Sequence, residues 1–138
     1  MRIPILLVAA ALLTGAADTV PIAGSAKLSP ADRAAISALE ATVLAQINTM
    51  GAVPTFTAMA AAGLPGDAAG QLAKIDAACG KAKSAERVET RVLGSSYVRE
   101  SLVVQHEKCL IKWDFAFAKN NGTWTMNYFN FNSPNGEW

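Results

Sequence analysis

The last third of the chain, from Glu86 to Asn132, constrains the fold most, because apolar and polar residues alternate there. The alternation runs through four segments: ERVETRVL, SSYVRESLVVQHEKC, LIKWDFAFAK and GTWTMNYFNFN. A period of two is typical of strands that bury one face. Asn120-Asn121-Gly122 predicts a tight hairpin, since Asn-Gly accepts the positive φ that such turns require. The sequence therefore predicts a four-stranded antiparallel meander.

The alternation also predicts which side chains share a face of each strand. The predicted sets are Val88, Thr90 and Val92 in the first strand; Val98, Leu102 and Val104 with Glu100 and His106 in the second; and Ile111, Trp113, Phe115 and Phe117 in the third. In the fourth strand Trp124, Met126 and Tyr128 alternate, but Phe129 and Phe131 shift the phase by one. We therefore expect a β-bulge near Tyr128-Phe129.

Upstream of the sheet, a long helix is predicted between Ser29 and Gly51. Ser29 is a good N-cap, Pro30 suits the first helical position, and Asp32 falls where a capping-box acid would. Gly51 suits the C-terminal end. The apolar residues step by three or four and form one stripe, which comprises Ile36, Leu39, Val43, Ile47 and Met50.

Two shorter helices are predicted between this helix and the sheet. The first covers Pro54 to Ala62, with Phe56 and Met59 facing inward. Gly63-Leu64-Pro65-Gly66 ends it, and Asp67 can cap the next helix. Gly80 ends that helix, and its inward residues at helical spacing are Leu72, Ile75 and Cys79.

The first 17 residues resemble a secretory signal peptide of bacterial type. Arg2 gives a short positive region, Ile3 to Leu13 is apolar but too short for a stable membrane anchor, and Thr14 to Ala17 are small. Cleavage after Ala16 or Ala17 would send the protein to the periplasm or the medium, with no stable membrane span left. The alternative is a buried N-terminal helix, which Pro4 disfavours.

Length and charge predict one domain with no affinity for nucleic acid. The chain has 138 residues with a formal net charge of +1, and loss of Arg2 with the leader brings it close to neutral. We assign residues 18–28 to a flexible N-terminus and residues 29–138 to a single α+β domain. Its predicted architecture is three helices packed on a curved four-stranded antiparallel sheet.

The two cysteines predict a disulfide between Cys79 and Cys109. An oxidising compartment favours a bridge over two free thiols, and this bridge would join the third helix to the second and third strands. Two buried free thiols and an intermolecular bond are the alternatives.

The order of elements resembles the nuclear-transport-factor-2-like, cystatin-like superfamily of cone-shaped α+β domains. The resemblance rests on segments between Val88 and Phe131, and it extends to small secreted bacterial members of that group. These segments are Val92-Leu93-Gly94-Ser95, Tyr97-Val98-Arg99 and Trp113-Asp114-Phe115-Ala116-Phe117, followed by Gly122-x-Trp124. The resemblance implies a fold and a frequent homodimer with sheets packed face to face, but it assigns no catalytic residue.

Three residues are candidates for acid–base chemistry, each with a structural alternative. His106 is the only histidine; it is either a general base inside the cone or a hydrogen-bonded residue near a strand end. Asp114 is either catalytic or paired with Lys112 or Arg99. Glu100 alternates with apolar neighbours and is a further candidate acid.

Binding candidates lie on the same strands. Tyr97 and Tyr128 could each offer a phenol to a ligand, or belong to the core or rim. Arg91 and Arg99 face each other across the first hairpin and could hold a carboxylate, or form a solvated edge. A single histidine without a cysteine or carboxylate at ligand spacing argues against zinc, and we expect no cofactor.

These observations leave three hypotheses about function. The first is an exported envelope module that binds a small apolar ligand or a protein partner through the concave face of the sheet. The second is an enzyme of the isomerase or cyclase kind that uses His106 with Glu100 or Asp114. The third is a homodimeric structural module without a ligand.

Overall fold

The computed structural model describes residues 27–60, 63–64 and 66–132, and within them the chain forms three helices followed by four strands. The order is α2 (Pro30–Met50), α3 (Ala52–Met59), α4 (Ala68–Cys79), β1 (Ala82–Val92), β2 (Tyr97–His106), β3 (Leu110–Asn120) and β4 (Thr123–Asn132). The predicted α+β class and element order are confirmed. The predicted signal peptide, residues 1–17, and most of segment 18–28 lie outside the described residues.

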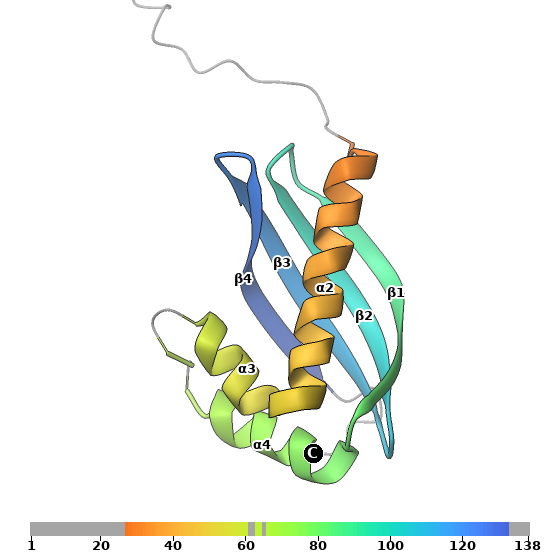
Figure 1. The fold of residues 1–138 in the computed structure, drawn as a ribbon, viewed down its shortest axis with the longest axis vertical. Coiled ribbons are helices and arrows are strands. Elements are labelled where there is room, and N and C mark those ends of the chain that lie inside the picture. Colours follow the sequence, from red (N-terminus) through yellow and green to blue (C-terminus); the bar gives the residue numbers. More distant parts are fainter. Residues whose placement is uncertain (1–26, 61–62, 65, 133–138) are drawn as a thin grey trace, which may run out of the picture.

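The strands form one antiparallel sheet in the order β1-β2-β3-β4, as the predicted meander requires. The long helix α2 crosses one face of the curved sheet, and α3 and α4 lie at the end where α2 finishes (Figure 1). One face of the sheet is therefore covered by helices, and none of the described helices lies on the other face, which we call the open face.

Helix α2 begins and ends where the sequence predicts. The hydroxyl of Ser29 accepts a hydrogen bond from the backbone N–H of Asp32 at 3.1 Å, and Gly51 follows the last turn with φ of 91°. The carboxylate of Asp32 also accepts bonds from Lys119 Nζ at 2.8 Å and Trp124 Nε1 at 2.7 Å. These two bonds lower the pKa of Asp32 to about 2, and they tie the start of α2 to the β3–β4 hairpin.

The apolar stripe of α2 differs from the predicted one at two positions. Ile36, Val43 and Ile47 are buried as expected, but Met50 is 48% exposed. Glu40 is buried instead, with only 4% of its surface accessible. Glu40 lies four residues after Ile36 and three before Val43, so it occupies the stripe itself.

The short helices follow the predicted pattern with small changes. Phe56 of α3 is fully buried, but Met59 is 37% exposed because it lies at the end of the helix. In α4, Leu72, Ile75 and Cys79 are buried as predicted. The start of α3 is capped by α4, since Asp76 accepts the backbone N–H of Ala52 at 2.8 Å. The two helices therefore hold each other in place.

Strand β1 begins earlier than predicted and contains a bulge. It starts at Ala82, and its register against β2 shifts between Ala82 and Ser84 and again between Arg87 and Glu89. At the second of these shifts Val88 is the extra residue, and it is 51% exposed. The bulge reverses the alternation, and Arg87 takes the helix-facing position opposite Leu102.

A third irregularity of the register lies in β4, as the sequence predicts. Ala116 pairs with Tyr128 while Phe117 pairs with Met126, so Asn127 is the extra residue. The bulge lies directly before the expected Tyr128-Phe129 position. It allows Trp124 and Met126, which precede it in the strand, and Phe129 and Phe131, which follow it, all to face the helices. Tyr128 consequently faces away from them.

Aromatic residues form the centre of the core. The ring of Phe56 lies 5.3 Å from that of Trp113 and 4.1 Å from that of Phe129, measured between centroids. Phe131 packs on Trp113 at 5.3 Å. Trp113, Phe115 and Phe117 are all fully buried, which confirms the predicted face of β3.

The predicted disulfide between Cys79 and Cys109 is present. It joins the last residue of α4 to the turn between β2 and β3, with α-carbons 5.1 Å apart. Backbone bonds flank the bridge, because Lys108 N–H donates to Cys79 O at 3.0 Å and His106 N–H donates to Cys109 O at 2.8 Å. The helical layer is therefore fastened to one end of the sheet.

Replacing Trp113 by alanine should lower the free energy of unfolding by roughly 3–5 kcal/mol, since it empties the centre of the aromatic core. Chemical denaturation measures the loss. Leu93→Ala is the control, because Leu93 is 56% exposed and its truncation should cost far less. A loss for Trp113→Ala no larger than that of the control would contradict the packing described above.

Replacing both Cys79 and Cys109 by serine should lower the free energy of unfolding by roughly 3.5–4 kcal/mol in the chain-entropy model. The estimate follows from the sequence separation of 30 residues. Urea denaturation of the double variant beside the parent under non-reducing conditions measures it. A double variant as stable as the parent would contradict this prediction.

Candidate functional site

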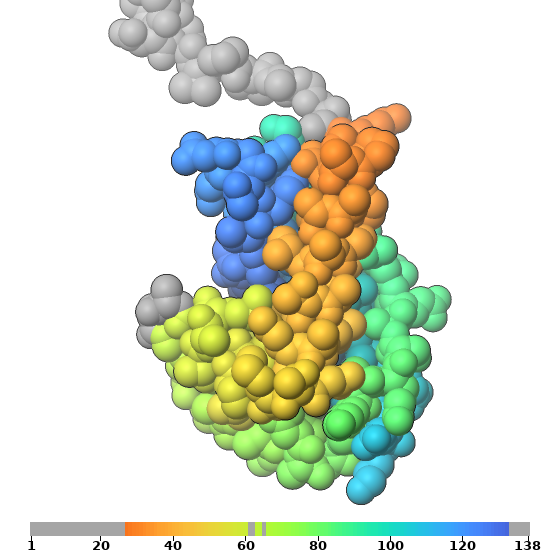
Figure 2. Space-filling model, viewed as in Figure 1, coloured from red at the N-terminus to blue at the C-terminus, as the bar shows by residue number. Residues whose placement is uncertain are grey.

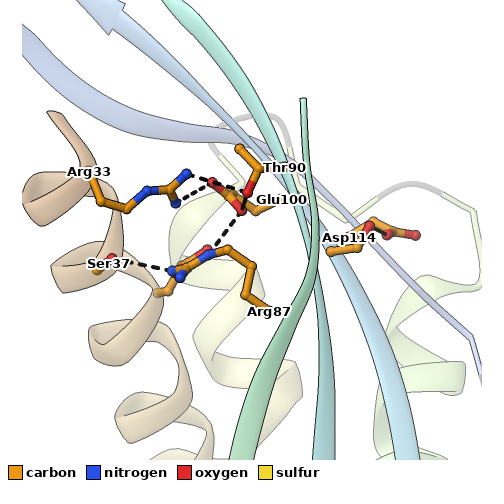
Figure 3. A network of polar contacts seen from close by, with 8 residues as sticks. Arg33, Ser37, Arg87, Thr90, Glu100 and Asp114 are labelled. Carbon is orange, nitrogen blue, oxygen red and sulfur yellow. Dashed lines mark hydrogen bonds and ion pairs between the residues drawn. The ribbon is translucent and has the colours of Figure 1, made fainter. Parts of the chain in front are cut away.

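Glu100, the candidate acid of β2, lies at the centre of a charged cluster between α2 and the sheet. Only 1% of Glu100 is exposed. Its Oε1 lies 2.6 Å from Arg33 Nη1, and its Oε2 lies 3.0 Å from Arg87 Nε. Thr90 Oγ1 donates to Oε2 at 2.7 Å. Figure 3 shows Arg33 reaching from α2 and Arg87 from β1 toward this carboxylate. Both oxygens of Glu100 are thus occupied.

Arg87 extends the cluster to a second buried acid on α2. Its Nη2 pairs with the Oε2 of Glu40 and donates to Ser37 Oγ at 3.2 Å. The cluster therefore contains two arginines and two glutamates, and its formal charge is zero when all four side chains are ionised. We call Arg33, Glu40, Arg87 and Glu100 the charged cluster.

The two acids of the charged cluster differ in how well they are satisfied. Glu40 Oε1 is buried and has no hydrogen-bond partner among the described residues. Burial raises the pKa of the Glu40 carboxyl, although its bond to Arg87 opposes the rise. An acid with a raised pKa can act as a proton donor, but Glu40 lies inside the helix–sheet interface and lines none of the hollows described below. Its contacts are those of a structural group.

Asp114 lies on the opposite side of the sheet from the charged cluster (Figure 3). It pairs with Lys112 Nζ at 3.3 Å and accepts a hydrogen bond from Ser101 Oγ. This confirms the predicted pairing with Lys112. The carboxylates of Asp114 and Glu100 therefore point to opposite faces of the sheet.

His106 faces the helices, as the alternation predicts, and is 1% exposed. Its Nδ1 lies 2.9 Å from Gly80 O, so Nδ1 carries the proton and donates it. Its Nε2 is buried without a partner among the described residues. Glu100 lies six positions away on the same strand, which is about 20 Å at the rise of a β-strand. The structure therefore does not bring the candidate base and acid together.

The tyrosine and arginine candidates gather on the open face of the sheet. Arg91 and Arg99 pair directly across β1 and β2, as expected. Arg91 forms an ion pair with Glu89, and the guanidinium of Arg99 lies 5.4 Å from the ring centre of Tyr128. Tyr97, paired with Ala118, is on the same face. A hollow of about 180 Å³ on this face is lined by acids as well as bases: Glu89, Arg91, Arg99, Glu100, Ser101, Lys112 and Asp114.

A larger and more apolar hollow lies beside the bulge of β4. It has a volume of about 340 Å³ and is bounded by the end of α3 and by β4. Figure 2 shows the yellow-green surface of α3 meeting the blue surface of β4 in this region. The lining residues are Met59, Ala60, Gly63, Met126, Asn127, Tyr128 and Phe129. We call this space the α3–β4 hollow.

The α3–β4 hollow is a remaining opening at the edge of the helix-covered face. Met126 and Phe129 are half-buried members of the core layer, and Met59 and Tyr128 are exposed at 37% and 43%. Of the predicted ligand-binding residues, Tyr128 lines this hollow and Tyr97 does not. Met126 and Tyr128 flank the bulged residue Asn127, and all three line the hollow.

Neither a metal site nor a membrane span is found in the part of the chain that the structure describes. No group of three or more His, Cys, Asp or Glu residues gathers there in a way that could hold a metal ion. None of the described helices combines the length and hydropathy needed to cross a membrane.

Comparisons with known proteins give no match: no protein-family model, no curated protein and no solved structure matches this chain.

Sequence reasoning missed Arg33, Glu40 and Arg87. One signal was present: Glu40 interrupts the apolar stripe of α2, and Glu100 alternates with buried residues of β2. Two acids directed into a core require basic partners, because an unpaired buried charge is very costly. Arg33 lies on α2, one turn before Ser37, and could have been named as a basic partner for these acids. Arg87 could not be identified, because strict alternation placed it on the open face.

The two acids of the charged cluster should respond differently to removal of their charge. Glu100→Gln leaves Arg33 and Arg87 without their shared partner and should cost roughly 3–5 kcal/mol, the range for breaking a buried ion pair. Glu40→Gln should cost less than about 1 kcal/mol or raise stability, since the raised pKa of Glu40 shows that its ionised form is disfavoured. Denaturation at pH 7 compares the variants; equal losses would contradict this difference.

The same shift predicts the pH dependence of the comparison. Because the folded chain holds the Glu40 proton more tightly, the unfolded chain ionises first as the pH rises. The contribution of Glu40 to stability therefore falls between its ordinary pKa and its raised pKa. Glu40→Gln lacks this loss, so its stability relative to the parent should increase as the pH rises from 4 to 7.

Proposed function

We propose that this protein is an exported, non-enzymatic module that binds a small apolar ligand in the α3–β4 hollow. The observation that carries the proposal is the hollow itself: about 340 Å³, at the edge of the helix-covered face, lined by Met59, Met126 and Phe129. The volume is within the usual range for small-molecule sites, which are mostly apolar with a few polar groups. Methionine adapts to ligands of varied shape.

The polar groups of the hollow would orient such a ligand rather than react with it. Asn127, the bulged residue of β4, and Tyr128 are on its wall. No residue that titrates near neutral pH is among its lining residues. This supports binding over acid–base chemistry.

The isomerase or cyclase alternative has weaker support. Both oxygens of Glu100 contact arginines, Asp114 lies across the sheet and pairs with Lys112, and His106 is buried about 20 Å from Glu100 along the strand. Each candidate group is committed to a contact that stabilises the fold. A catalytic role would require that at least two of them leave these contacts.

The proposal also includes export of the protein from the cell and membership of the nuclear-transport-factor-2-like superfamily. Export to the periplasm or the medium is supported by the apolar leader and by the disulfide, which persists in oxidising compartments. Membership of the nuclear-transport-factor-2-like superfamily is supported by three helices on a curved antiparallel meander.

The neutral fluorescent probe N-phenyl-1-naphthylamine tests the proposed binding. Its emission rises in an apolar site, and we expect saturable binding to the folded protein. Met59→Asp places a carboxylate at the hollow and should weaken probe binding at least tenfold, or about 1.4 kcal/mol. Because Met59 is 37% exposed, the variant should stay folded, which circular dichroism verifies.

The matched control is Leu93→Asp, which adds the same charge at a residue that is 56% exposed and follows β1, the strand at the opposite edge of the sheet from β4. Its probe affinity should equal that of the parent. The proposal is wrong if the parent does not bind the probe, or if Met59→Asp and Leu93→Asp bind it equally well.

A further inference from the structure

The open face of the sheet carries a small hollow that is lined mainly by charged side chains. Its volume is about 180 Å³. We call it the open-face hollow, and its lining residues are Glu89, Arg91, Arg99, Glu100, Ser101, Lys112 and Asp114. The carboxylate of Glu100 adds no charge to this hollow, because it points to the opposite side of the sheet from Asp114 (Figure 3). Three basic and two acidic side chains remain, so the formal charge of the open-face hollow is +1.

Both acids of the open-face hollow are already paired. Glu89 forms an ion pair with Arg91 on the same strand. Asp114 pairs with Lys112 Nζ at 3.3 Å and accepts a hydrogen bond from the hydroxyl of Ser101. These contacts neutralise two of the three cations and leave the third without a counter-charge in the hollow.

The third cation is Arg99, and an aromatic contact holds it in place. Among the residues that the structure describes, Arg99 takes part in no ion pair. Its guanidinium lies 5.4 Å from the ring centre of Tyr128. Arg99 and Tyr128 are the two cross-strand partners of Ala116, which is fully buried although it belongs to the open face. The small side chain of Ala116 therefore leaves room for Arg99 and Tyr128 to meet above it, and their contact positions the guanidinium.

Arg99 also lies directly opposite a second arginine. Arg91 and Arg99 are cross-strand partners, and the β-carbons of such partners are roughly 4.5–5.5 Å apart. Like charges at directly opposite positions destabilise an antiparallel pair. Glu89 offsets only one of these two charges. A further negative charge between the arginines would remove the repulsion, so the arrangement favours a bound anion.

We propose that the open-face hollow binds the carboxylate group of a small organic acid, with Arg99 as the main contact and Arg91 beside it. A guanidinium presents parallel N–H donors that match the two oxygens of a carboxylate. A monoanion also balances the +1 charge of the hollow.

The size of the open-face hollow limits the ligand. A volume of about 180 Å³ is below the roughly 300–1,000 Å³ of sites for drug-sized molecules, so the acid has only a few carbon atoms. The open-face hollow and the α3–β4 hollow share no lining residue. The inference therefore does not rest on the proposed apolar ligand.

Titration of the protein with sodium butyrate, followed through the backbone amide chemical shifts, tests the proposal. Sodium chloride keeps the ionic strength constant, because salt screens exposed charges. We expect saturable shifts centred on residues 89–91, 99–101 and 112–114. Butyramide has nearly the same shape without the charge and should not produce them. Absence of saturable butyrate binding at these residues, or equal binding of butyramide, would overturn the proposal.

Two substitutions of Arg99 test its role. Arg99→Gln removes the guanidinium and should weaken butyrate binding by roughly tenfold, as expected for loss of a charge-assisted contact. Arg99→Lys keeps the charge but lacks the forked donors, and we expect binding weaker by roughly threefold. Arg99 is exposed, so both variants should stay folded, which the amide spectrum verifies. Unchanged affinity in either variant would contradict this role.

The matched control is Lys74→Gln, which removes one positive charge from an exposed position of α4. Its butyrate affinity should equal that of the parent. A loss as large as that of Arg99→Gln would show that butyrate responds to the net charge of the protein, and the proposed site would be wrong.

An acidic side chain of a second copy could occupy the open-face hollow instead, and sedimentation separates the two cases. A site for a small acid predicts the same association state for the parent and for Arg99→Gln, with and without butyrate. A parent dimer that dissociates on this substitution or on addition of butyrate would overturn the proposal in favour of an interface between copies.

Discussion

Burial of the aromatic row of β3 against the helices is the interaction on which the rest of the structure depends. Trp113, Phe115 and Phe117 are fully buried on one face of an interior strand. Phe56 brings α3 onto this row, and Phe129 and Phe131 bring β4 onto it. Large aromatic side chains bury roughly 150–250 Å² each, so this contact supplies much of the hydrophobic stabilisation of a small domain.

The charged cluster occupies the other part of the helix–sheet interface, between α2 and strands β1 and β2. Removing charges from water costs several kcal/mol per ion, so the cluster is a weak source of net stability. Its contribution is positional: Glu100 contacts one arginine from α2 and one from β1. A shift of α2 along the sheet would break these pairs, and we therefore interpret the cluster as the feature that fixes the register of α2 on the sheet.

Two β-bulges determine where polar and apolar groups lie. The bulge at Val88 places Arg87 on the helix-facing side, where it completes the charged cluster. The bulge at Asn127 sets Met126 and Phe129 on the helix-facing side and Tyr128 on the other. The α3–β4 hollow lies at this second bulge, so the candidate binding site and the irregularity of the strand have the same origin.

By itself, the sequence determined the class of fold, the face of each inner strand, the ends of α2 and the pair of cysteines that bond. These features depend on local rules: the period of alternation, the capping residues Ser29 and Gly51, and the turn Asn121-Gly122. It also located the β4 bulge to within one residue, because Phe129 and Phe131 break the phase visibly. Only the tertiary structure decided that Arg87 faces inward, that Glu100 is neutralised rather than free to react, and that a hollow lies beside Met59. No local pattern marks the Val88 bulge, since ERVETRV alternates without a break, and the partners of a buried charge come from segments distant in sequence. Which acids are satisfied and which surface stays open depend on how α2, α3 and the strands meet, and that arrangement is a property of the packed molecule.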